Sequence, residues 1–503
     1  KHFIVPWIES PLIGAADEYL VFQQRHEANS VELFFDLFFV ANLATFTAYH
    51  SITNHDELLA YIGFFSILWS SWYQITLHDV RFARDSVYER VCKTFQFGCF
   101  VALALVGSGF YPGSEKSNNT NFRILCYTLM FLRILSTFQY AIVFIFTARA
   151  GQRYRKLLFP LSLHIATFAI AAVVFGSLVP GYRKGEEHNQ GTYAAWWVVM
   201  FFEATSILVT ASKWRMLSFK KTHIVERMGL LTLIVVGEGA IGATKTIGRL
   251  MGKGGLDLEA SGLVLCIVLI LVFIWMLYFD NHPIGHYGTI RQQIWAVLHF
   301  PLHLSIVGVV EGAQQIAAAR YVLRGLDKFE RSSFEYCNVQ QLNGSRLYAK
   351  LNQTIAYYQF DSKPESAIEL RLVYNELDIL ANVTDACTVW PQSQEAKDAA
   401  KHLLHRMMGA IYATLGIQVA WEKDMAVVAV ESWKIVYVYY WASMLVLILV
   451  MTMLLYLIRK HRADLFDWIS MISRAIVFVV CALFLAVAAS DEILYGLIST
   501  TAL

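Results

Sequence analysis

The residues of this chain that could do chemistry are acids and histidines inside long apolar stretches. Residues 31–40, VELFFDLFFV, carry Glu32 and Asp36 one helical turn apart. In a helix, both acids would project from one face. Acids at membrane depth are costly unless they are paired or hydrated, so they indicate a functional site. The alternative is that Glu32 lies at the interface and Asp36 only fixes a neighbouring helix.

Glu238 is the strongest single candidate for an ion site. It lies near the middle of an apolar stretch and is flanked by Gly237, Gly239 and Gly242, which let another backbone or an ion approach. A carboxyl group at this depth suits a proton or cation site. The alternative is an ion pair with Arg133, which is central in another apolar stretch.

A third candidate set lies in one later stretch. His299 and His303 are four residues apart, and Glu311 and Gln314 follow on the same side of a helix. A His-x-x-x-His pair can hold a metal ion, but the sequence defines no third ligand. A proton or cation path and ordinary structural histidines are the other two interpretations. The predicted ion pathway comprises Asp36, Arg133, Glu203, Glu238, His299, His303 and Glu311.

The composition indicates which elements must position these residues. Of 503 residues, 56% are hydrophobic and 16% are charged, which is typical of a polytopic membrane protein. A net charge of +2 gives no reason to expect nucleic acid binding. We predict an all-α membrane protein with about eleven transmembrane helices. They span about 31–50, 58–78, 92–111, 122–148, 157–180, 194–212, 228–247, 260–279, 292–320, 434–458 and 468–488.

Basic residues predict the orientation of these helices. Lys and Arg cluster in the loops after the second, fourth and sixth spans, for example at Arg84, Arg153 and Lys220. The positive-inside rule places these loops and the N-terminal segment 1–30 in the cytoplasm. Four glycosylation acceptors fall on the opposite side, at Asn118, Asn343, Asn352 and Asn382. We therefore expect an integral membrane protein of the secretory pathway, in the plasma membrane or a vacuolar or endosomal membrane.

Three regions follow the N-terminal segment. Residues 31–320 are expected to form a nine-helix membrane core, and residues 434–503 two further membrane helices with a C-terminal tail. Residues 321–433 read as a soluble insertion on the lumenal or extracellular side.

Within this insertion, Cys337 and Cys387 are expected to pair, because two cysteines in an oxidising compartment usually form a disulfide. Two free thiols are the alternative. Residues 395–418 predict an amphipathic helix with apolar side chains spaced by four. The helix could pack on its own domain, lie on the membrane or bind a partner.

An internal repeat is a further hypothesis. Three residues in or beside the first three spans recur 201 positions later in or beside the seventh to ninth spans. Spans 1–3 and 7–9 would share one orientation and so form parallel repeats. Chance matches are the alternative. The pairs are Asp79 and Asp280, Arg90 and Arg291, and Gly107 and Gly308.

Three motifs resemble a known family. They are VELFFDLFFV at 31–40, HIVERMGLLTLIVVGEGAIG at 223–242 and WMLYFDNHP at 275–283. With the histidines of the ninth span, they are similar to the bacterial low temperature requirement A family and its fungal relatives. The resemblance covers residues 31–320 and implies a membrane protein of this class, as a fungal-type member. The insertion and the last two spans lie outside it.

The first functional hypothesis is a transporter or channel for a small ion, with proton coupling. The second is an intramembrane metal-dependent hydrolase that uses His299 and His303. The third is a receptor or assembly scaffold that uses the insertion. Because the sequence carries no phosphate-binding loop, nucleophile elbow or dinucleotide fingerprint, we do not favour an enzyme. We expect no cofactor and disfavour a metal, while bound lipid is compatible with such helices. The expected partners are the lipid bilayer and a small ion or solute, and a homodimer is permitted.

Overall fold

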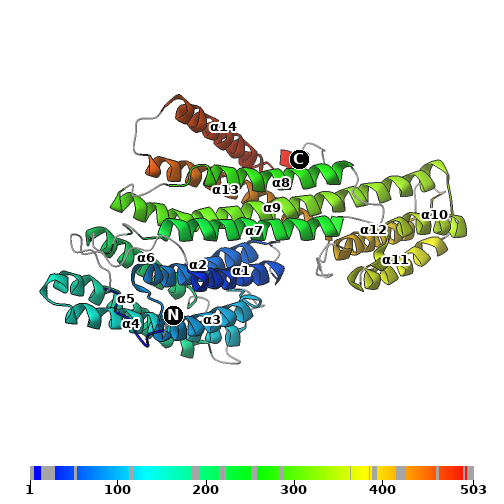
Figure 1. Cartoon of the computed structure of the whole chain (residues 1–503). Helices are drawn as coiled ribbons and strands as arrows, with labels where there is room; N and C mark the ends of the chain where they lie inside the picture. The colour runs from blue at the N-terminus through cyan, green and yellow to red at the C-terminus, as the bar shows by residue number, and fades with distance from the viewer. Residues whose placement is uncertain are drawn as a thin grey trace. The chain divides into compact units, whose positions relative to one another are not determined.

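The computed structural model describes most of the chain, and Figure 1 shows the course of its helices. The chain divides into two compact units. The first unit comprises Lys1–Glu238, Ile274–Val307 and Ser443–Val480, and the second comprises Gly239–Phe273, Gly308–Ala442 and Cys481–Leu503. The described residues are 5–12, 29–49, 52, 54–112, 118–182, 192–214, 217, 219, 222–250, 258–283, 288–362, 364–383, 386–387, 393–414, 425–459, 464–490 and 493–494.

The regular elements of the described residues are all helical, which confirms the predicted all-α fold. The first seven α-helices are α1 Ser30–Tyr49, α2 His55–Phe82, α3 Val87–Gly107, α4 Asn119–Arg149, α5 Leu158–Leu178, α6 Ala194–Lys213 and α7 Ile224–Leu250. The others are α8 Leu258–Phe279, α9 Thr289–Phe334, α10 Gly344–Tyr357, α11 Pro364–Asn382, α12 Gln394–Thr414, α13 Met425–Ile458 and α14 Leu465–Val487. Short turns are η1 Gln152–Leu157, η2 Val179–Gly181, η4 Glu335–Val339 and η5 Phe360–Ser362.

Each of the eleven predicted spans corresponds to one of these helices. Ten helices in the described part of the chain are long and apolar enough to cross a membrane. Of the eleven predicted spans, the one at 228–247 is not among these ten. It corresponds to α7, which is helical throughout but carries the charged residues Glu226, Arg227, Glu238 and Lys245. Charges reduce its mean hydropathy, so its length alone marks it as a span.

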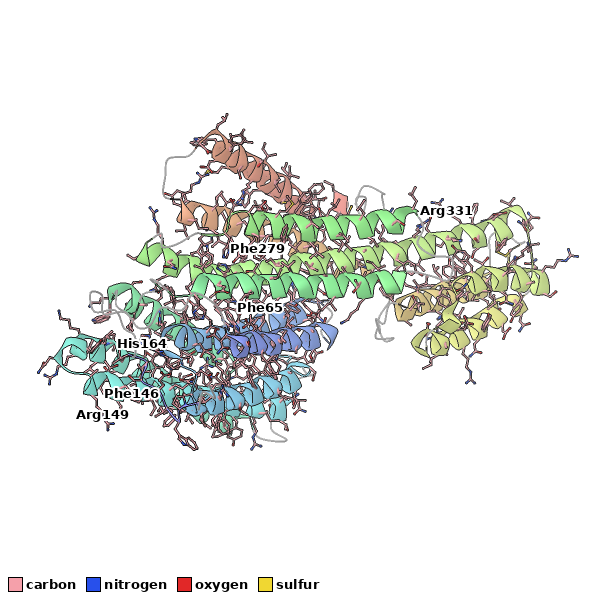
Figure 2. All side chains as sticks on the ribbon, in the orientation of Figure 1. Phe65, Phe146, Arg149, His164, Phe279 and Arg331 are labelled. Carbon is pink, nitrogen blue, oxygen red and sulfur yellow. A yellow bond between two sulfur atoms is a disulfide. The ribbon has the colours of Figure 1, made fainter. Side chains whose placement is uncertain are left out.

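The helix α2 is central in the first unit. Nearly every side chain from Ala60 to Phe82 is buried, and α2 contacts α1, α4 and α6. Other packed pairs of the first unit are α1 with α3, α3 with α4, α4 with α5 and α5 with α6. Figure 2 labels His164 of α5, whose ring stacks on Tyr140 of α4 with centroids 5.2 Å apart. Polar side chains on α2 therefore face other helices.

Side chains on the outside of the helices are apolar, as a bilayer requires. Leu105 of α3 is 73% exposed, Val173 of α5 is 72% exposed and Phe466 of α14 is 79% exposed. Large exposed apolar surfaces of this kind mark contact with a membrane or a partner. Together with the ten spanning helices, they identify an integral membrane protein.

The predicted insertion is entirely helical in its described residues. The helix α9 has 46 residues and runs through position 320 without a break, so the predicted domain boundary there falls within one helix. The helices α10, α11 and α12 follow and lie side by side, with α11 in contact with both others. The domain division itself stays a prediction.

The predicted amphipathic helix is present as α12. Its residues Ala399, Leu403, Met407 and Ile411, spaced by four, are all buried. The final part of the predicted range, 415–418, lies outside the described residues. Burial of these four residues favours packing on its own domain over the membrane or partner alternatives.

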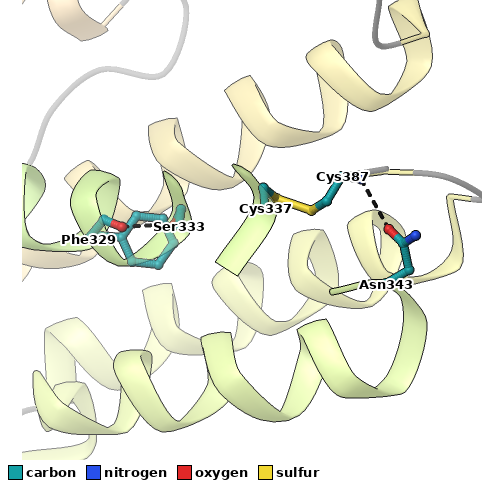
Figure 3. Close-up of a disulfide and its surroundings, with 5 residues drawn as sticks. All are labelled: Phe329, Ser333, Cys337, Asn343 and Cys387. Atoms are coloured by element: carbon teal, nitrogen blue, oxygen red, sulfur yellow. Dashed lines mark hydrogen bonds between the residues drawn. A yellow bond between two sulfur atoms is a disulfide. The ribbon is translucent and has the colours of Figure 1, made fainter. Parts of the chain in front are cut away.

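The predicted disulfide between Cys337 and Cys387 is confirmed (Figure 3). It closes a loop across a sequence separation of 50 residues. The backbone N–H of Cys387 also donates a hydrogen bond to Oδ1 of Asn343, at 3.1 Å. Glycosylation of Asn343, Asn352, Asn382 and Asn118 stays a prediction, as does the orientation of the chain.

The repeat also stays a prediction. One of its proposed pairs occupies unlike environments, because Asp79 is 1% exposed and Asp280 lies on the surface. The carboxylate of Asp79 pairs with the Lys93 ammonium group inside the first unit. Asp79 is therefore a buried, paired acid.

Candidate functional site

Asp36 is one of the fully buried acids of the first unit. Its side chain is fully buried on α1, and its Oδ1 accepts two hydrogen bonds. Arg227 Nη2 of α7 donates one at 2.9 Å, and Trp72 Nε1 of α2 donates the other at 2.8 Å. Three helices that are distant in sequence therefore meet at one carboxylate oxygen. The alternative interpretation, in which Asp36 only fixes a neighbouring helix, accounts for these hydrogen bonds to α7 and α2.

A second pair repeats this contact one turn earlier on both helices. Glu32 Oε2 lies 3.1 Å from His223 Nε2, and both side chains are buried. Glu32 and Asp36 are four residues apart, as are His223 and Arg227. Each pair spans 191 positions, so α1 and α7 run parallel and in register. Glu32 is thus a buried acid with a histidine beside it, and its depth in the membrane stays a prediction.

The Asp36–Arg227 pair leaves polar atoms without partners. Among the described residues, no group hydrogen bonds to Asp36 Oδ2 or to Arg227 Nε and Nη1, although all three atoms are buried. The guanidinium carbon lies 5.8 Å from the centre of the Trp72 ring, which supplies a weaker contact. Buried polar atoms without partners are uncommon and point to strain, bound solvent or function.

Arg133 and Glu203 form a different kind of pair. Arg133 Nε donates to Glu203 Oε1 at 2.9 Å, and Nη2 donates to Oε2 at 2.8 Å. A third nitrogen, Nη1, donates to the Ser71 hydroxyl at 3.2 Å. Both carboxylate oxygens are engaged in a planar two-bond contact, which is geometrically specific. Arg133 is therefore the partner of Glu203, and it joins α4 to α6 and α2.

Both predicted histidines are fully buried and hydrogen bonded through both ring nitrogens. His303 Nδ1 accepts from Trp69 Nε1 at 3.1 Å, because an indole N–H only donates. Its Nε2 lies 2.8 Å from the Thr232 hydroxyl, whose own proton goes to the Met228 carbonyl. Nε2 must then donate, so His303 is a neutral imidazole with the proton on Nε2.

His299 takes the opposite tautomer. Its Nδ1 lies 2.8 Å from the Trp295 carbonyl oxygen, which can only accept. Nε2 lies 2.8 Å from the Tyr278 hydroxyl and accepts from it. Neither histidine offers a free lone pair, so a metal ion would have to displace one of these contacts. Within the described residues, no cluster of three or more His, Cys, Asp and Glu side chains could hold a metal.

Two tryptophans of α2 connect the acid pairs to His303. Trp72 donates to Asp36 and Trp69 donates to His303, and their ring centres are 6.4 Å apart. The connected groups extend along α7 from its first turn to Thr232. We name this set the buried polar column. It comprises Glu32, His223, Asp36, Arg227, Trp72, Trp69, His303 and Thr232.

The sequence analysis placed Asp36 and His303 in one predicted pathway. In the structure, contacts through Trp72 and Trp69 connect these two residues. Glu238 and Glu311 are each half-buried and have contacts of their own. Glu311 Oε1 accepts from Gln315 Nε2 at 2.8 Å within the second unit. A role for Glu238 or Glu311 in an ion pathway stays a prediction.

The three glycines around Glu238 differ in how closely other side chains approach them. A Cβ atom on Gly239 would lie 3.0 Å from side chains of Leu271 and Val310, so close helix packing requires this glycine. One on Gly242 would clash with the Gln314 side chain at 2.6 Å. Gly237 has open space around it. Gly239 and Gly242 thus make room for neighbouring side chains, and the approach of a backbone or an ion stays a prediction.

Sequence reasoning missed five of the eight residues of the column, namely His223, Arg227, Trp72, Trp69 and Thr232. One signal could have identified the two bases: they repeat the four-residue spacing of Glu32 and Asp36 with opposite charge. Lys93, the partner of Asp79, carried no comparable signal.

Comparison with known families gives one match. The family model described as Bacterial low temperature requirement A protein (LtrA) matches residues 27–327, which is more than half of the chain and includes the whole buried polar column. No curated protein and no solved structure matched the chain.

Proposed function

Because this integral membrane protein belongs to the bacterial low temperature requirement A family, we propose that it transports a small cation or proton through the buried polar column of its first unit. The pathway begins at the Glu32–His223 pair, passes Asp36 and Arg227, and continues to His303. Transport and not catalysis is favoured because the ionisable groups are distributed along three helices and not gathered around one reacting atom.

One observation carries this proposal. Asp36 and Arg227 are held together through a single oxygen, and the remaining polar atoms of both groups have no partner among the described residues. An ion pair of this kind in a low-dielectric interior is poorly compensated. A proton on Asp36, or a cation beside its Oδ2, would compensate the pair in a second state.

The tryptophans would set the resting state. The indole N–H groups of Trp72 and Trp69 occupy acceptor positions on Asp36 and His303. An indole can donate but cannot accept, so it does not relay protons. Movement of α2 or rotation of these rings would free both acceptors. These acceptor atoms would then bind the transported ion in place of the indole N–H groups.

Flux into liposomes tests this proposal. The purified full chain is reconstituted, and proton flux is followed with an enclosed pH-sensitive dye under an imposed membrane potential, with potassium and sodium gradients in parallel. We expect flux above that of empty liposomes and at least a ten-fold reduction in Asp36→Asn. Asp85→Asn is the matched control, because Asp85 is 48% exposed and pairs with Arg90 at the surface.

Two results would contradict the proposal. One is the absence of flux of every ion tested in wild-type protein that is folded and correctly inserted. The other is wild-type flux in Asp36→Asn. Equal loss in Asp36→Asn and Asp85→Asn would indicate a general effect of removing acids, and would also remove Asp36 from the pathway.

A further inference from the structure

A second group of polar side chains lies beside the column in the first unit. On α3, Lys93 and Gln96 are buried and Glu89 is half-buried, and their spacing of four and three residues places them on one face of the helix. Gln96 Nε2 donates to Gln139 Oε1 of α4 at 3.2 Å, and Gln139 Nε2 donates to Glu89 Oε2 at 3.4 Å. The helix α3 therefore turns a polar face toward other helices, and this face begins at Glu89.

The buried acid Asp79 of α2 meets this face at Lys93. The ammonium group of Lys93 donates to Asp79 Oδ2, and both side chains are almost fully buried. Beside Asp79 on the same helix, His78 has its Nδ1 3.8 Å from Asp79 Oδ1. Among the described residues, no group hydrogen bonds to Asp79 Oδ1 or to either ring nitrogen of His78, although all three atoms are buried. An ion pair that only joined α2 to α3 would not explain these unsatisfied atoms.

Glu89 connects this group to one end of the first unit. It lies in the first turn of α3, where the chain has just turned from α2. Its neighbours Asp85 and Arg90 have side chains that are 48% and 56% exposed, so this end of the bundle reaches the surface. Glu89 also interacts electrostatically with His78. Its carboxylate therefore lies between the surface and the buried groups of α2.

Lys93 and Asp79 connect the same group to the column. Lys93 Nζ lies 4.9 Å from the centre of the Phe35 ring, and Phe35 directly precedes Asp36 on α1. Asp36 interacts electrostatically with Lys93, and Glu32 interacts electrostatically with Asp79. Both acids of the column thus sense the Asp79–Lys93 pair.

The chemistry of this group favours a proton over a metal cation. A carboxylate and an imidazole can each take up a proton and release it again, and histidine does so near neutral pH. The ammonium group of Lys93 instead repels any further cation that approaches Asp79, because charges in a low-dielectric interior are poorly screened. A proton avoids this repulsion, since it moves along existing groups and adds no separate ion.

We propose that Glu89, His78 and Asp79 load the buried polar column with protons. With Lys93, which holds Asp79 through Oδ2, they form what we call the access branch. Glu89 takes a proton from water and passes it to the neutral ring of His78, which becomes an imidazolium. The imidazolium releases its other proton to Asp79 Oδ1 and is neutral again, and Glu32 of the column then receives the proton from Asp79. This inference rests on the proposed function and narrows its substrate from a small cation to the proton.

Flux in liposomes tests the access branch at Glu89. The wild type, Glu89→Gln and Glu89→Asp are reconstituted as full chains, and proton, potassium and sodium fluxes are normalised to folded, inserted protein. We expect the wild type to carry protons at least about ten-fold faster than either metal ion. Glu89→Gln should lose proton flux at least about ten-fold, because an amide cannot take up and release the proton. Glu89→Asp keeps a carboxyl group and should stay within about two-fold of the wild type.

A second variant separates proton transfer from packing. His78→Phe keeps an aromatic ring against Phe82 and Tyr140, whose ring centres lie 5.6 Å and 5.3 Å from that of His78. It removes two ring nitrogens that have no hydrogen bond partner among the described residues, so thermal unfolding should not show a loss of stability. Proton flux should nevertheless fall at least about ten-fold. Asp85→Asn is the matched control at the same end of the unit and should keep wild-type flux.

Three results would overturn the access branch and leave the proposed function standing. The first is wild-type proton flux in Glu89→Gln or His78→Phe while Asp36→Asn has lost its flux. The second is potassium or sodium flux in the wild type that equals the proton flux. The third is an equal loss in Glu89→Asp and Glu89→Gln, which would show that the carboxyl group is not what matters. Absence of every flux in the wild type would contradict both proposals.

Discussion

Two buried ion pairs of the first unit differ in how completely they are satisfied. Arg133 and Glu203 share two hydrogen bonds, whereas Arg227 and Asp36 share one. Removing one member of a fully desolvated pair leaves the other charge buried without compensation. The first pair therefore fits a structural link, and we propose the second as the exchangeable element of the column. This distinction leads to opposite expectations for the two acids.

Glu203→Gln should destabilise the protein, because it leaves the Arg133 guanidinium buried without an acid. We expect a cost of about 3 to 5 kcal/mol, measured by denaturant unfolding in micelles. The double variant Arg133→Met with Glu203→Leu removes both charges and should cost less than Glu203→Gln alone. A double variant that is less stable than the single one would contradict the assignment of a structural ion pair.

At the scale of helices, the sequence predicted well where each helix lies along the chain. It predicted poorly which face of each helix points toward its neighbours. Apolar runs identified α1 to α9, α13 and α14, because length and hydropathy are properties of one helix. The partner of Asp36 is set by how α1, α2 and α7 turn toward one another. That rotation depends on the packing of all three helices, and a single-helix pattern does not contain it. The prediction of Asp36 as the functional acid therefore came without Arg227 or Trp72.

Gly312 provides a test of helix packing in the second unit. Gly312→Ala would place a Cβ atom 2.9 Å from Cβ of Tyr440, which cannot move without its backbone. Overpacking of this kind costs about 1 to 3 kcal/mol. Gly262→Ala on α8 is the matched control, because nothing lies within 4 Å of its added Cβ. There we expect a gain of up to about 1 kcal/mol from helix propensity. Thermal unfolding that ranks the two variants in the reverse order would refute this packing.

At the scale of the whole molecule, the part that matches the family is followed by helices with a disulfide of their own. The family match ends at residue 327, and the disulfide between Cys337 and Cys387 follows it. Cysteine spacing and the predicted compartment were sufficient to predict this bond. The long continuous helix α9 was not predictable, because the polarity of the sequence changes near 320 while its helical periodicity continues.

The disulfide should stabilise the helices of the insertion. Replacing both cysteines with Ser releases a loop across 50 residues, which should cost about 3 to 4 kcal/mol. Limited proteolysis should then cut the region of α10 and α11 at least ten times faster. Cys266→Ser, at an exposed free cysteine of α8, is the control and should be cut as the wild type is. Unchanged cutting in the double variant would show that the bond contributes little.

The most direct test of the central claim compares Asp36→Asn with Glu203→Gln in the same flux assay, normalised to folded, inserted protein. The buried polar column predicts that Asp36→Asn loses at least ten-fold of the proton or cation flux. Glu203→Gln should lose folded protein but keep its flux per folded molecule within about two-fold. Unchanged flux in Asp36→Asn, together with loss of flux in Glu203→Gln, would place the pathway at the Arg133–Glu203 pair and contradict the account.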